Sequence, residues 1–60
     1  MSKRAVDAVF ESLFILTDIR VMLRETAPGH DLDVSQKERI RSLLDDLEKR
    51  VAVLREELAR

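Results

Sequence analysis

Residues 9–23 read VFESLFILTDIRVML, and this stretch decides the fold. Ten of its fifteen residues are large and apolar, and none is glycine or proline. The apolar positions recur with the 3.6-residue period of an α-helix and cover most of its circumference. A helix that is apolar most of the way round must be buried on several sides. One partner helix from the same chain cannot cover it, so we expect self-association or a partner protein.

The apolar run lies inside a longer segment, residues 3–26, that we expect to form the first helix. Ser2 is placed to cap this helix, because a serine hydroxyl accepts a hydrogen bond from an amide of the first turn. Residues 27–33 are the expected turn. There Pro28 cannot continue a helix, and Gly29 offers a permissive backbone for the reversal.

The second helix is expected over about residues 34–59, with two competing start signals. Residues 35–38 (SQKE) fit a capping box, and residues 33–36 (DVSQ) are a rival two residues earlier. Further along, apolar residues alternate four and three apart, which is the period of a coiled-coil seam. We expect this seam to hold the hairpin closed, and it consists of Ile40, Leu44, Leu47, Val51, Leu54 and Leu58.

The fold class that follows is all-α: an antiparallel two-helix hairpin that self-associates into a four-helix bundle, with residues 1–60 as a single domain. Chains of this length bury little apolar surface and rely on disulfides, metals or oligomerisation. The chain has no cysteine, so disulfides are excluded. We expect a two-fold homodimer, with a tetramer as the alternative. The expected interface residues are Val6, Phe10, Leu13, Phe14, Leu16 and Val21.

Charged residues form 38% of the chain, but the signs nearly balance at a net charge of -1. Proteins that follow a phosphate backbone carry a basic excess, so a nucleic-acid partner is disfavoured. Arg20 and Arg24 would contact phosphate if a bundle presented them; otherwise they lie along the interface and pair with acids of the second helix. With no signal peptide and no run near the ~20 apolar residues of a membrane span, we expect a cytoplasmic protein without membrane contact.

Chemically reactive groups are sparse. His30 is the only histidine, and a catalytic base needs an orienting partner and a pocket that a short turn does not offer. Asp7 and Glu11 could face one metal ion, but carboxylate sites in helical bundles also use a helical histidine, and neither expected helix has one. We therefore expect no enzyme activity, no cofactor and no metal site.

These observations predict a small oligomeric module for protein–protein interaction or scaffolding. Such a module can also serve as an accessory or regulatory subunit of a larger protein. The alternative is a small nucleic-acid-binding regulator built as a hairpin-dimer four-helix bundle, with Arg20 and Arg24 as the phosphate contacts.

Overall fold

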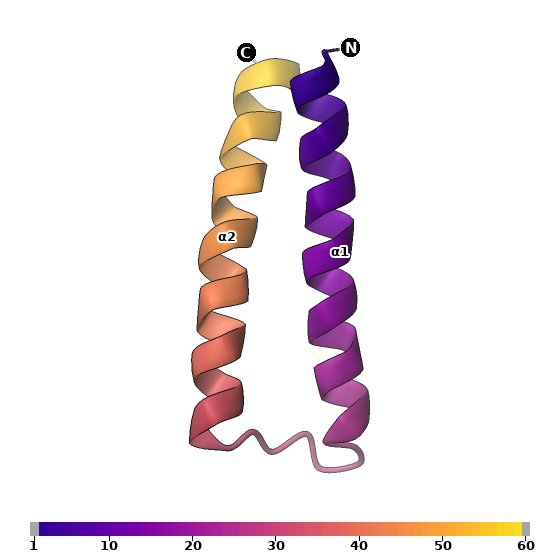
Figure 1. Ribbon diagram of the computed structural model, residues 1–60, viewed down its shortest axis with the longest axis vertical. Coiled ribbons are helices and arrows are strands. Elements are labelled where there is room, and N and C mark those ends of the chain that lie inside the picture. Colours follow the sequence, from indigo (N-terminus) through magenta and orange to yellow (C-terminus); the bar gives the residue numbers. More distant parts are fainter. Residues whose placement is uncertain (1, 60) are drawn as a thin grey trace.

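In a computed structural model, which describes residues 2–59, the chain forms two helices joined by one connection. Helix α1 spans Lys3–Glu25 and helix α2 spans Val34–Leu58. The helices lie antiparallel and side by side along a rod of 40 × 16 × 14 Å (Figure 1). The predicted all-α hairpin is therefore confirmed. Each helix ends one residue before the end expected from the sequence.

Both helices begin at a side-chain cap. The Oγ atom of Ser2 accepts a hydrogen bond from the Ala5 amide at 3.1 Å, as predicted. At the start of α2, Oδ1 of Asp33 accepts from the Gln36 amide at 2.8 Å, and Oε1 of Gln36 accepts from the Asp33 amide at 2.9 Å. The earlier of the two rival start signals is therefore the one that forms, because these two residues satisfy each other's amides.

The end of α1 is closed by the turn at residues 26–30. The His30 amide donates to the Thr26 carbonyl at 2.8 Å, and Nδ1 of the His30 ring lies 2.9 Å from the Leu23 carbonyl oxygen. That carbonyl is one of the groups that a helix end leaves without an internal partner. The left-handed residue of the turn is His30, with φ of 57°, and not Gly29 as the sequence suggested. This backbone turn aims the histidine ring back at the helix.

His30→Ala is expected to lower the free energy of unfolding by about 1 kcal/mol relative to His30→Gly. Both variants lose the ring contact with the Leu23 carbonyl. Only alanine keeps the cost of a left-handed backbone, which glycine adopts freely. Urea denaturation at one fixed protein concentration measures the difference. Equal stability of the two variants would show that the left-handed turn does not persist in solution.

The contact between the two helices is narrow. On α2 no residue is buried, and the side chains nearest α1 are only half-buried. On α1 the buried residues are Ala5, Ala8, Ile15 and Met22. Two of these four are alanines, which remove little apolar area from water. The hairpin therefore leaves most of its large apolar side chains in contact with solvent.

Candidate interaction surface

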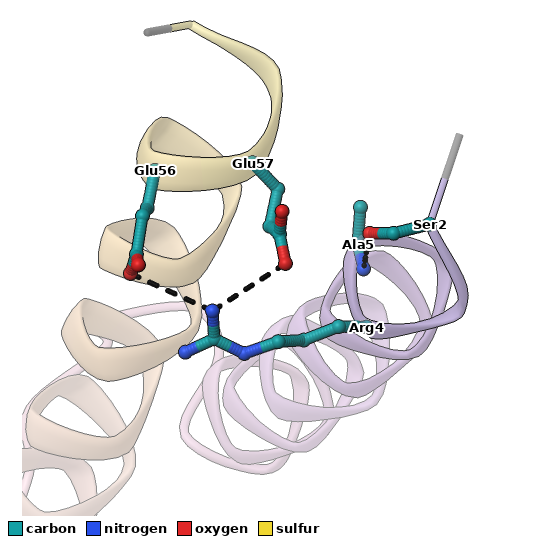
Figure 2. A network of polar contacts seen from close by, with 5 residues as sticks. All are labelled: Ser2, Arg4, Ala5, Glu56 and Glu57. Atoms are coloured by element: carbon teal, nitrogen blue, oxygen red, sulfur yellow. Dashed lines mark hydrogen bonds and ion pairs between the residues drawn. The ribbon is translucent and has the colours of Figure 1, made fainter.

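Ion pairs along one side of the hairpin set the register of the two helices. Nε of Arg50 lies 2.9 Å from Oε2 of Glu11, and Nη1 of Arg4 lies 3.4 Å from Oε1 of Glu57. Figure 2 shows the Arg4 guanidinium extending from α1 between the carboxylates of Glu56 and Glu57 on α2. We call this side of the hairpin the ion-paired side. It fixes which residues of α1 and α2 are level with one another.

The seam predicted on α2 divides into two rows. One row is half-buried against α1 and contains Ile40, Leu47 and Leu54. The other row is exposed and contains Leu44, Val51 and Leu58. The structure corrects the expectation for this second row, which does not close the hairpin. The reason is that Arg50 and Glu57 form ion pairs with α1, and these pairs rotate α2 so that its second row turns outward.

The exposed row of α2 continues onto α1 as a single surface, which we call the apolar face. On α1, Val9, Leu16 and Leu23 are seven residues apart, so they follow one line along the helix. The register of the ion pairs places Leu16 level with Leu44. Helical periodicity places both rows on the side opposite the ion pairs. The apolar face consists of Val9, Leu13, Leu16, Leu23, Leu44, Val51 and Leu58, all exposed.

Shallow hollows follow the α2 edge of the apolar face. Leu44 and Val51 line one of them, with Glu48 and Arg55 beside them. Leu44 also lines the next hollow, together with Arg41. Apolar hollows bordered by charged side chains are the form that a helix seam takes when a facing helix inserts its own side chains. The apolar face therefore has both the chemistry and the relief of a helix-packing surface.

Three further exposed apolar residues lie on the outer side of α1, away from α2. Phe10 is 56% exposed, Phe14 is 69% exposed and Val21 is 47% exposed. Their spacings of four and seven place them on one stripe, which we call the phenylalanine stripe. The six interface residues predicted from sequence thus fall into two groups, because Leu13 and Leu16 lie on the apolar face. Val6, between the two groups, is half-buried.

Four basic residues gather at the end of the apolar face that lies nearest the turn. The register of the ion pairs puts Arg20 level with Arg41, and Arg24 level with Lys37. All four side chains are exposed, and none forms an ion pair within residues 2–59. We call this group the basic end. The expected pairing of Arg20 and Arg24 with acids of α2 does not occur in this part of the chain.

The carboxylates considered for a metal site are occupied by cations of the chain. Asp7 lies 4.0 Å from Nζ of Lys3, and Glu11 contacts Arg50. Within residues 2–59 no group of three or more histidine, cysteine or acidic side chains is arranged to hold a metal ion. In the same residues, neither helix has a stretch long and apolar enough to cross a bilayer.

No family model matches the chain, and no match was found among curated proteins or solved structures. The surface itself must therefore indicate the function. Sequence reasoning missed that Lys37 and Arg41 join Arg20 and Arg24, because this grouping depends on the register between the helices. It also missed the division of the seam. The seven-residue recurrence of Leu44, Val51 and Leu58 was the available signal.

Proposed function

We propose that this protein is a small self-associating interaction module in which two hairpins pack their apolar faces together as a four-helix bundle. The observation that carries the proposal is the contrast between seven exposed residues of the apolar face and only four buried residues in the hairpin. Contiguous exposed apolar surface of this kind marks an interaction site. A chain of 60 residues also needs more buried area than one hairpin supplies.

A second copy of the chain is the partner that fits the apolar face best. The rows on α1 and α2 are both aliphatic and both repeat every seven residues. Rows of that period match each other along their whole length. Two identical faces related by a two-fold axis close the assembly, since each surface is covered by the same surface of the other copy.

The phenylalanine stripe stays outside a dimer built on the apolar face, because it lies on the far side of α1. Aromatic side chains supply much of the binding energy in protein interfaces. Phe10 and Phe14 are therefore the residues through which the dimer would bind a larger protein. This gives the molecule the form of an adaptor or accessory subunit, with one surface for its own copy and another for a partner.

Light scattering coupled to size-exclusion chromatography tests the proposal. The expected mass is about twice the 7.0 kDa of one chain, with dissociation on dilution. A tetramer would mean that the phenylalanine stripe also pairs with itself. A fully helical 7.0 kDa particle at low micromolar concentration would contradict self-association.

The basic end supports a second candidate function, binding of nucleic acid. Arg20, Arg24, Lys37 and Arg41 are exposed and free of ion pairs within residues 2–59, although the chain as a whole has a charge of -1. Phosphate contacts release counterions, so affinity for a short RNA or DNA duplex would fall steeply with salt. The double variant Arg20→Ala, Arg24→Ala is expected to reduce both the affinity and the salt dependence. Weak binding that the double variant leaves unchanged would reject this function.

A further inference from the structure

The apolar faces of two hairpins can pack around a two-fold axis in two ways, and the distinction rests on the proposed self-association. In the turns-together arrangement the axis runs along the rod, and each α1 packs on α2 of the second copy. In the turns-apart arrangement the axis runs across the rod. Each helix then packs antiparallel on its own counterpart, and the two turns lie at opposite ends of the bundle. Apolar burial alone does not separate the two, because both cover the same face.

The basic end opposes the turns-together arrangement. That arrangement keeps the register of the hairpin, so residues level within one chain also become level between chains. Arg20 and Arg24 would face Arg41 and Lys37 of the second copy, and the two-fold axis would repeat this contact. No acidic residue of the apolar face lies at this level to separate them. Like charges placed together across an interface disfavour that mode of association.

The turns-apart arrangement brings opposite charges together instead. When the apolar faces overlap fully, the axis passes near the level of Leu16 and Leu44. Arg41 precedes Leu44 by three residues and Glu48 follows it by four. An antiparallel α2 pair therefore sets Arg41 opposite Glu48 of the second copy, and the axis forms the same pair again. Both side chains are exposed and without an ion pair within the described residues, so both are available.

We infer that the protein forms a turns-apart dimer in which reciprocal Arg41–Glu48 pairs between the two copies select the arrangement. The occupant of the apolar face is then a second copy in one defined orientation. The two basic ends lie far from each other, at opposite ends of the bundle. Electrostatic complementarity of this kind sets orientation and register more than it sets affinity.

Charge exchange tests the inference because the two arrangements predict opposite signs. In the turns-apart dimer, Arg41→Glu and Glu48→Arg each raise the dissociation constant by about tenfold, and the double variant returns it to near the original value. Sedimentation equilibrium at low salt measures these constants, and high salt reduces the differences. In the turns-together dimer, Arg41→Glu would instead tighten association, because the new carboxylate would face Arg20 and Arg24. That result would overturn the inference.

A thiol crosslink gives a second measurement that does not depend on affinity. The chain has no cysteine, so Leu44→Cys supplies the only thiol. In the turns-apart dimer the two thiols lie near the axis, and a short thiol-to-thiol crosslinker yields a covalent dimer. Ala59→Cys is the matched control and stays uncrosslinked, because its two copies lie at opposite ends. Crosslinking through position 59 but not 44 would contradict the inference.

The mass of the unchanged protein separates the two possible failures. A monomer of 7.0 kDa would reject the proposed self-association altogether. A dimer that becomes tighter with Arg41→Glu, or that crosslinks only through position 59, would keep the proposed function and reject only the turns-apart arrangement.

Discussion

Leu16→Asp should leave the protein as a largely unfolded monomer at concentrations where the unchanged chain is a folded dimer. Leu16 is 48% exposed in the hairpin and lies at the centre of the apolar face. Packing of two faces would bury one carboxylate from each copy with no cation opposite it. Such a buried unpaired charge costs about 3–5 kcal/mol. The dissociation constant is therefore expected to rise by at least about a hundredfold.

Loss of helix accompanies loss of the dimer in this prediction because the hairpin alone has so little core. Only four side chains of α1 are buried, and two of them are alanines. Circular dichroism and light scattering on the same samples measure both effects. A Leu16→Asp variant that remains a stable dimer, or that becomes a fully helical monomer, would count against the proposed assembly.

Phe14→Asp is the matched control for Leu16→Asp. The two positions are two residues apart on α1, and both substitutions replace a large apolar side chain with aspartate. Phe14 is 69% exposed and lies on the outer side of the helix. A dimer built on the apolar face leaves it in water, so the mass should not change. If instead Phe14→Asp dissociates the protein and Leu16→Asp does not, the phenylalanine stripe is the interface between copies.

Ile15→Ala is expected to destabilise the fold by about 2–4 kcal/mol. Ile15 is 7% exposed and is the largest aliphatic side chain buried between α1 and α2 near the middle of the rod. Truncation removes buried methylene groups and leaves a cavity that a thin two-helix contact cannot close without moving a helix. Urea denaturation followed by circular dichroism, at one fixed protein concentration, measures the loss.

Phe14→Ala provides the comparison for this second prediction. It removes more atoms than Ile15→Ala from the neighbouring position, but from a side chain that is mostly in solvent. The expected change is within about 0.5 kcal/mol, as for other surface substitutions. Equal losses for the two variants would mean that α1 faces α2 through a different side from the one described.

The chain's own sequence determined its secondary structure. Proline and glycine after Ala27 divide two uninterrupted helical patterns, and the helices Lys3–Glu25 and Val34–Leu58 follow those patterns closely. Ser2 and Asp33 begin the helices through contacts with residues three positions away. Helical period, capping and chain breaks all act over a few residues, so they can be recognised without knowing the fold.

The tertiary structure alone decided which side of each helix faces the other. The sequence indicated one six-residue seam on α2, and ion pairs from Arg4 and Glu11 to α2 rotated that seam so that Leu44, Val51 and Leu58 turned outward. The same rotation created the apolar face and gathered the basic end from two distant segments. An apolar stripe wider than its partner can rotate at little cost in buried area. A few ion pairs between helices, invisible to local pattern, therefore selected the orientation.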